Sequence, residues 1–187
     1  MNSRRKINSF RQSGFSMVEI LVTLIILLIG LLGLAGLQMQ AQRAEMESYQ
    51  RVQALVLLQD ITERISANSA NLASYVGVNV GPGDGQPAVT ACATQTTMAA
   101  RDLCEWSNAL KGASEQSGGG SVGAMVGARG CITSSVPSSV IVSAAWQGLG
   151  VTTAPAAVDT CGLNQYDLET KRRVISLPLT IGCLACP

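Results

Sequence analysis

The first third of the chain follows a helical pattern of apolar positions that changes character along its length. Residues 15–37 are apolar on every side apart from Glu19. Farther along, apolar residues recur on one helical face only, at Ala54, Leu58, Ile61, Ile65 and Leu72. The pattern predicts one helix over about residues 15–70, with stop signals at Asn68, Asn71 and Gly77. Its second half is amphipathic and needs a domain to cover the apolar stripe.

Residues 15–37 are long enough to cross a bilayer, because a helix of that length spans about 35 Å. One interpretation is a single membrane anchor that leads into a stalk, and the other is a helix that packs in a bundle of like helices. A secretory signal would also turn from basic to apolar, and Leu34-Ala35-Gly36 is a weak candidate cleavage site. However, the apolar run is longer than a usual signal and continues directly into good helix formers. Two acid-before-base pairs also favour a continuing helix: Glu47 with Arg51, and Asp60 with Arg64.

The remainder of the chain predicts a small globular domain. Residues 77–87 are rich in glycine and proline and predict a loop, whereas residues 94–111 predict a second helix. The apolar face of that helix consists of Ala99, Leu103, Trp106 and Leu110. Glycine and serine dominate residues 112–130, which we expect to be mobile.

Three strands are predicted after this segment, with a long loop at 147–171. Their ranges are Gly130–Val136, Val140–Trp146 and Arg172–Ile181. Consecutive strands after a helix predict an α+β fold, in which a small antiparallel sheet packs on the amphipathic half of the first helix beside one extra helix.

Charge and composition narrow the possible functions. The 187 residues are 47% hydrophobic and only 13% charged, their net charge is +1, and they include no histidine. The balanced charge argues against nucleic-acid binding, and the lack of histidine removes catalytic triads and imidazole metal sites. Four basic residues precede the apolar segment and predict a cytoplasmic N-terminus with the domain outside: Arg4, Arg5, Lys6 and Arg11.

The segment Gly14-Phe15-Ser16-Met17-Val18-Glu19, with its basic leader and apolar helix, resembles the class III leader of type IV pilins and pseudopilins. The resemblance implies that prepilin peptidase cleaves between Gly14 and Phe15 and that the new Phe15 amine is N-methylated. It also implies the pilin fold. The corresponding domains are residues 1–14 (leader), 15–37 (membrane and assembly half of the helix), 38–76 (amphipathic half) and 77–187 (periplasmic α+β domain).

Four further segments resemble the PilV family of minor pilins, the type IV pilus modification proteins. They are Asp60–Asn68, Asp102–Trp106, Gly130-Cys131 and Ser143–Trp146. This resemblance implies a structural subunit that helps to initiate the pilus and lies near its tip. The implied partners are other minor pilins, the major pilin, prepilin peptidase, the inner-membrane assembly platform and a tip adhesin.

The position of Glu19 fits this resemblance on physical grounds. A carboxylate in a bilayer costs several kcal/mol unless it is paired or protonated. Cleavage would free the Phe15 amine, and a staggered neighbour could place its own amine on Glu19 and so set the axial register. Alternatively, Glu19 reaches the interface from one turn inside the membrane. Likewise Gly30, Gly33 and Gly36 either allow close helix approach and unwinding or are ordinary membrane-helix glycines.

Two motifs that suggest other chemistry fit poorly. Residues 118–123 have the G-x-G-x-x-G spacing but follow no predicted strand, which disfavours dinucleotide binding. Cys183-Leu-Ala-Cys186 has C-x-x-C spacing but lies at the chain end, not at the start of a helix. We therefore expect no catalytic site, metal or cofactor. An export compartment favours disulfides over a four-cysteine zinc site.

Six cysteines allow three bridges and fifteen pairings. We favour Cys131–Cys161, which would pin the long loop to the sheet. A Cys92–Cys104 bridge requires the second helix to start late, near Met98, because a fully helical connection would separate the two too far. Cys183–Cys186 could close a terminal ring.

Three functions remain open at this point. The first is a minor pilin, located in the inner membrane before assembly and in the pilus afterwards. The second is a type II secretion pseudopilin, which would share the leader and differ in its neighbouring genes. The third, a membrane-anchored periplasmic enzyme, lacks support in the residues.

Overall fold

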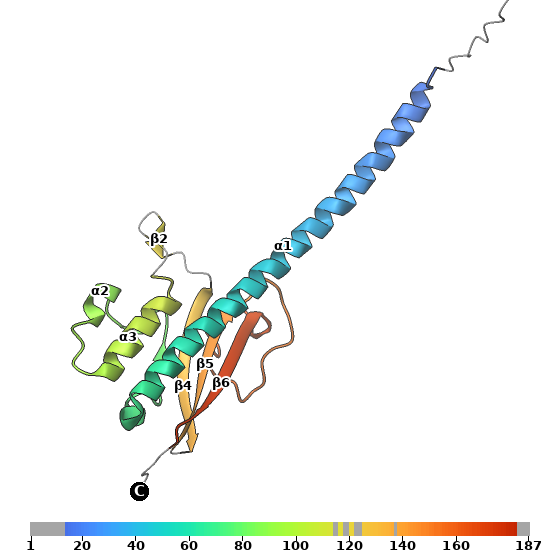
Figure 1. The fold of residues 1–187 in the computed structure, drawn as a ribbon. Helices are drawn as coiled ribbons and strands as arrows, with labels where there is room; N and C mark the ends of the chain where they lie inside the picture. The colour runs from blue at the N-terminus through green and yellow to red at the C-terminus, as the bar shows by residue number, and fades with distance from the viewer. Residues whose placement is uncertain (1–13, 114–115, 118–119, 122–124, 137, 183–187) are drawn as a thin grey trace, which may run out of the picture. The chain divides into compact units, whose positions relative to one another are not determined.

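The computed structural model describes residues 14–113, 116–117, 120–121, 125–136 and 138–182 (Figure 1). The chain divides into two compact units, Met1–Gln42 and Arg43–Pro187. The described residues of the first unit are helical apart from residues 14–16, which precede the helix. The second is an α+β domain with a four-stranded antiparallel sheet, which confirms the predicted fold class.

Helix α1 (Met17–Ala67) has 51 residues and two different environments. Its residues up to Met46 are all exposed. Within the second unit one face is buried, and it carries the predicted stripe together with two added residues: Gln50, Ala54, Leu57, Leu58, Ile61 and Ile65. The predicted change from an all-round apolar helix to an amphipathic one is therefore confirmed.

The helix ends at Ala67, three residues earlier than predicted, and a 3₁₀ helix η1 (Ser69–Ser74) follows. Asn68 and Asn71 lie at the two breaks, with backbone φ of −114° and −111°. Their side chains hydrogen bond to one another at 2.7 Å, an alternative that competes with helical bonding. The last predicted stripe residue, Leu72, still packs on the core from η1.

The second predicted helix starts later than expected. A short helix α2 (Val89–Cys92) is separated from α3 (Met98–Leu110) by a turn. The Thr97 side chain accepts a hydrogen bond from the Ala100 N–H and so caps α3, which is why the helix does not start at residue 94. Its predicted apolar face is confirmed, because Ala99, Leu103, Trp106 and Leu110 are all buried.

The main sheet has the order β1-β4-β5-β6, and all its neighbours are antiparallel. Its long strands are β4 (Val126–Val136), β5 (Ser139–Gln147) and β6 (Arg172–Thr180), close to the three predicted ranges. The short strand β1 (Asn79–Val80) corrects the prediction that residues 77–87 are entirely loop. Its residues pair with Cys131 and Gly130 of β4.

A second, two-stranded sheet forms within the glycine-rich segment. Strands β2 (Gln116–Ser117) and β3 (Gly120–Ser121) pair antiparallel there. We expected residues 112–130 to be mobile; the structure places these two short strands and the start of β4 inside that range. The dinucleotide-type spacing at 118–123 therefore falls on and around a hairpin strand.

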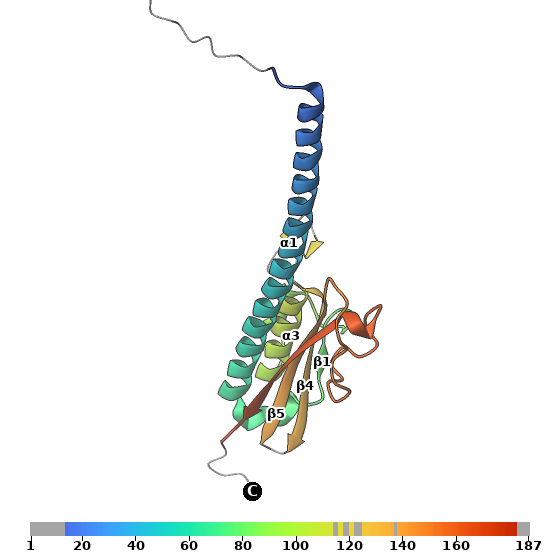
Figure 2. The same cartoon turned by 90° about the vertical axis from the view of Figure 1, so that its right-hand side faces the viewer.

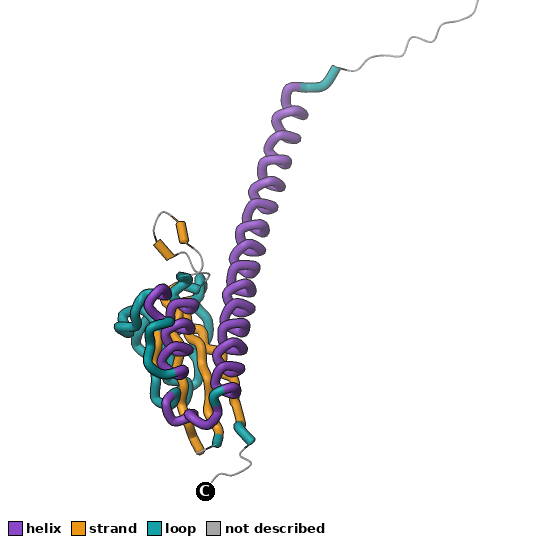
Figure 3. Tube along the Cα trace, turned by 60° about the vertical axis from the view of Figure 1, so that its left-hand side comes forward, coloured by secondary structure: helices purple, strands orange, loops and turns teal. Residues whose placement is uncertain are grey.

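The two faces of the main sheet are covered differently (Figure 2). The main core lies between one face and the helices, with Ile61, Trp106, Ile132 and Val142 among its fully buried members. A smaller cluster on the other face contains Cys131, Ala145 and Cys161. The long connection at 148–171, which Figure 3 shows as loop apart from the short η2 (Glu169–Lys171), supplies Cys161 to this cluster.

Candidate functional site

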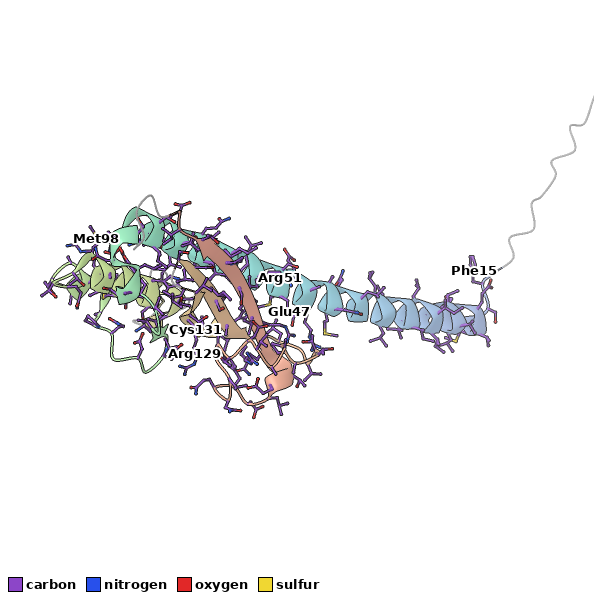
Figure 4. All side chains as sticks on the ribbon, turned by 90° about the horizontal axis from the view of Figure 1, so that it is seen from below. Phe15, Glu47, Arg51, Met98, Arg129 and Cys131 are labelled. Atoms are coloured by element: carbon purple, nitrogen blue, oxygen red, sulfur yellow. A yellow bond between two sulfur atoms is a disulfide. The ribbon has the colours of Figure 1, made fainter. Side chains whose placement is uncertain are left out.

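The start of α1 holds the residues that the sequence singles out for processing. Gly14, Phe15 and Ser16 precede the helix in a non-helical segment, and the Phe15 side chain is 80% exposed (Figure 4). The Ser16 carbonyl accepts hydrogen bonds from the N–H groups of Glu19 and Ile20. Glu19 lies in the first turn, where a carboxylate interacts favourably with the helix dipole.

The described surface around Gly14 is open to a large partner. A Cβ built on Gly14 would meet no atom within 4 Å. The peptide bond between Gly14 and Phe15 is thus in an accessible, non-helical segment. A peptidase requires these properties of a cleavage site. The rest of the basic leader lies outside the described residues.

The apolar part of α1 is not covered by any other part of the chain that the structure describes. An 18-residue window reaches a mean hydropathy of 2.9 with none of it buried, so the helix is long and apolar enough to cross a membrane by length and composition. Gly30, Gly33 and Gly36 also have open space at their Cβ positions. Such a surface needs lipid or other apolar helices around it.

A charged network joins α1 to α3. The Arg64 guanidinium donates to Asp60 at 3.0 Å and to Glu105 at 2.5 Å, and it contacts Asp102 at 3.4 Å. Burial alone would lower the pKa of Arg64, but the hydrogen bonds to Glu105 and Asp60 outweigh this effect and raise the pKa above its ordinary value. The predicted pair Asp60–Arg64 is confirmed, whereas its extension to α3 was not visible in the sequence.

Tyr75 is also part of this network. Its hydroxyl donates to Asp102 at 2.5 Å and accepts from the Asn68 amide at 2.9 Å. Burial and the bond to Asp102 raise the pKa of Tyr75 to about 12. The structure therefore brings together the segments 60–68 and 102–106, which lie far apart in the sequence.

The other two segments that carry the minor-pilin resemblance meet the same core. Gly130 lies directly against the Trp106 ring, so that any Cβ at this position would overlap the indole. Gly130 and Cys131 pair with Ala144 and Ser143 of β5. Gly130 thus meets the main core, whereas Cys131 belongs to the smaller cluster on the other face of the sheet.

The predicted ion pair between Glu47 and Arg51 is wrong. Glu47 does not pair with Arg51; its carboxylate instead accepts from Arg173 of β6 at 3.2 Å and from the Gly150 N–H at 3.2 Å. Arg173 also donates to the Gly150 carbonyl. A long-range partner replaces the local one because β6 and the loop both reach this face of α1.

Asp84 organises the turn between β1 and α2. Its carboxylate accepts from the Gly81 and Gln86 N–H groups, from the Ser107 hydroxyl and from Lys111. Burial alone would raise the pKa of Asp84, but these hydrogen bonds outweigh it and lower the pKa to about 2. The carboxylate therefore acts as a structural anchor between the loop and α3.

Two disulfides staple the domain. Cys131 and Cys161 pair with a Cα–Cα distance of 5.7 Å, the bridge that we favoured. Cys92 and Cys104 pair at 5.5 Å, and α3 indeed begins at Met98, as this bridge requires. Cys183 and Cys186 lie outside the described residues, so that the proposed terminal ring stays a prediction.

The long loop is held at several points besides Cys161. The buried Arg172 donates to Glu169 and to the carbonyls of Asp159 and Cys161. A hydrogen bond from the Asn164 N–H and a second from Arg172 lower the pKa of Glu169. The loop is thus a pinned part of the domain surface.

Comparison with known proteins agrees with these features. Residues 9–35 match the prokaryotic N-terminal methylation motif, and residues 36–105 match the family model described as type IV pilin Tt1218. Searches of the curated proteins and of the solved structures find no match to the chain. Residues 9–35 are thus similar to a prokaryotic N-terminal methylation motif and residues 36–105 to a type IV pilin, and the exposed apolar helix and the α+β domain agree with both matches.

Proposed function

We propose that this chain is a minor pilin of a type IV pilus, a structural subunit that helps to initiate assembly and lies at or near the tip. The observation that carries the proposal is the Gly14-Phe15 step and Glu19 at the head of a helix whose apolar residues are exposed on all sides. A helix of this kind is stable first in a bilayer and then among like helices in a filament. Pilins form a family of structural subunits, and we assign the chain no catalytic role.

In this proposal prepilin peptidase cuts after Gly14, and Phe15 becomes the methylated N-terminus. Before assembly, the protein spans the inner membrane once, with its leader in the cytoplasm and its domain in the periplasm. Glu19 then pairs with the Phe15 amine of a neighbouring subunit. That ion pair neutralises two charges that would each be costly in an apolar surrounding.

The convergence of the four PilV-like segments supports the assignment to the minor pilins. Segments drawn from residues 60–146 are joined by hydrogen bonds, strand pairing and packing that involve Tyr75 and Trp106. Coherent packing of this kind is what a shared fold would require of those residues. The proposed partners are other minor pilins, the major pilin, the assembly platform and a tip adhesin.

A pseudopilin of a type II secretion system is the second candidate. The methylation motif and the exposed apolar helix fit it equally well, because both kinds of subunit carry the same leader. The neighbouring genes distinguish the two proposals, because they encode either the components of a pilus or those of a secretion system.

Quantitative proteomics of sheared filaments tests the minor-pilin proposal. Deletion of the gene should reduce the number of surface pili without changing the shaft, and the chain should be rare in wild-type filaments. Cross-linking of the full chain in the membrane should recover other minor pilins. If this chain proved to be the dominant filament subunit, or if deletion stopped secretion and left pili intact, the proposal would be wrong.

A further inference from the structure

Strand β6 forms one edge of the main sheet, and the orientation of its backbone can be derived from the register. β5 and β6 pair so that partner numbers change in opposite directions, from Ser139 with Thr180 to Gln147 with Arg172. Hydrogen bonds continue this register at both ends, from the Ile181 N–H to the Ser138 carbonyl and from the Gly148 N–H to the Lys171 carbonyl. In an antiparallel ladder, bonded positions alternate with positions whose polar groups face away.

Odd-numbered residues of β6 therefore bond to β5, and even-numbered residues direct their N–H and C=O groups to the free edge. Pro178 has an even number and fits this assignment, because a proline on an edge strand lacks only an outward N–H. The Arg172 N–H is already bound to the Glu169 carbonyl. The outward groups of Val174 and Ser176 have no backbone partner among the described residues.

The same edge exposes apolar side chains. Ile175, Leu177 and Leu179 point to the helix-covered face and pack on the core, yet each remains half-buried. Apolar side chains at the rim of a core lose further exposed area when a strand is added beside them.

A cavity of about 470 Å³ opens at the start of this edge. Its wall includes Glu47, Ser48 and Arg51 of α1 and Arg173, Val174 and Ile175 of β6. Glu47 is already neutralised by Arg173. Arg51 has no ion pair among the described residues, which leaves the cavity with one unbalanced positive charge (Figure 4).

We propose that the β6 edge binds the C-terminal extended segment of another polypeptide, added antiparallel to β6, with its terminal carboxylate in the cavity beside Arg51. The backbone of the segment bonds to Val174 and Ser176, and its alternate apolar residues cover Ile175 and Leu177. Pro178 ends the pairing, so that the added strand is short. The antiparallel direction places the C-terminus of the segment at the Val174 end of β6, where the cavity lies.

This inference goes beyond the proposed function and does not depend on it. Strand addition gives affinity through main-chain bonds and specificity through side-chain pockets. The positive charge at one end selects a free carboxylate and so fixes the direction of the strand. A second copy of the same domain surface does not meet this description, because β6 itself carries no carboxylate at its free edge.

The direct test uses the full chain in detergent micelles and a defined probe. The probe is the peptide acetyl-Lys-Lys-Thr-Val-Thr-Val-Thr-Val, made once with a free carboxylate and once as the amide. Amide hydrogen exchange should show new protection at Val174 and Ser176 when the acid peptide binds. The amides of Ile175 and Leu177, already bonded to β5, are the internal control and should not change.

Two variants with matched controls sharpen the test. The acid peptide should bind about two- to fivefold more tightly than the amide, as expected for one exposed ion pair, and Arg51→Gln should abolish this preference. Arg43→Gln, on the exposed start of the same unit, should preserve it. Ser176→Pro removes one outward donor and should weaken binding of both peptides by about tenfold, whereas Ser176→Ala should not.

The outcomes are decisive in either direction. Edge-specific protection together with loss of the carboxylate preference in Arg51→Gln supports the proposal. Failure of both peptides to protect Val174 and Ser176 overturns it, and so does a carboxylate preference that persists in Arg51→Gln. The Arg51 comparison does not depend on whether the proline variant folds.

Discussion

Single residues in this protein act mainly by holding distant segments together. Asp84 ties the β1–α2 turn to α3, and Arg64 links α1 to α3. Gly130 allows β4 to approach the Trp106 ring. Each of these roles depends on a contact between residues far apart in the sequence, and each predicts a measurable change in stability.

Asp84 should make the domain sensitive to acid. Its pKa is about 2 in the folded protein against 3.8 for an ordinary aspartate. Because the folded pKa is lowered, its contribution is complete above about pH 5 and is lost progressively as the pH falls through 3.8 and then through the folded pKa of about 2. The size is about 2 kcal/mol. Asp84→Asn should lose this amount at neutral pH and flatten the acid limb of unfolding curves; an unchanged acid limb would contradict the assignment.

Gly130→Ala should destabilise the domain by about 1–3 kcal/mol, because the added methyl overlaps the Trp106 ring and the surroundings must shift. Gly182→Ala is the matched control, since a Cβ there meets no atom within 4 Å. Denaturant unfolding followed by tryptophan fluorescence compares the two. Equal stability of both variants would show that the β4–α3 contact is looser than described.

Glu19→Ala tests the proposed register role at the same scale. The variant should still be cleaved and inserted, because it removes a charge that is costly in the membrane. It should enter filaments poorly, because the neighbour's Phe15 amine would lose its partner. Immunoblots of membranes and sheared filaments measure both properties. Normal incorporation of the alanine variant would refute the pairing.

Secondary-structure elements were predicted well where a long apolar period existed and poorly where long-range pairing decided the structure. The stripe of α1 and the apolar face of α3 follow directly from helical spacing. The two-residue strand β1 could not be predicted from a glycine- and proline-rich segment, since only its pairing with β4 makes it a strand. Glu47 is a similar case, because its partner Arg173 lies 126 positions away.

The Cys92–Cys104 disulfide could be predicted only in part from the sequence. The Cys92–Cys104 bridge depended on where α3 begins, and a capping threonine at residue 97 decides this. The sequence indicated that this bridge requires a late start of the helix, but it did not predict that Thr97 caps the helix and so sets that start. The processing residues of the candidate site, in contrast, lie in one short segment and could be identified without any fold.

Removal of each bridge should destabilise the domain to a degree that reflects the loop it closes. Replacing Cys92 and Cys104 by alanine should cost about 3 kcal/mol, and replacing Cys131 and Cys161 about 4 kcal/mol, because their separations are 12 and 30 residues. Native alkylation should label none of these four cysteines. Labelling of either pair in the folded protein, or a larger loss from the first pair, would contradict the described connectivity.

At the scale of the whole molecule, the chain combines two units that require different surroundings. Residues up to Gln42 expose an apolar helix that requires lipid or neighbouring helices, while residues from Arg43 form a disulfide-stapled domain with its own core. The match to the methylation motif, residues 9–35, lies within the first unit, and the match to the type IV pilin model, residues 36–105, runs from the end of the first unit into the second. Our central proposal is that the chain is a prepilin, which prepilin peptidase cleaves at the peptide bond between Gly14 and Phe15.

The most direct test is the mass of the mature N-terminal peptide, measured from cells with and without prepilin peptidase. Our account predicts a protein that begins at methylated Phe15 in the first case and retains its leader in the second. Replacement of Gly14 by a bulky residue should reproduce the uncleaved form. A mature protein that begins at Gly36, or one that keeps Met1 in cells with active peptidase, would contradict it.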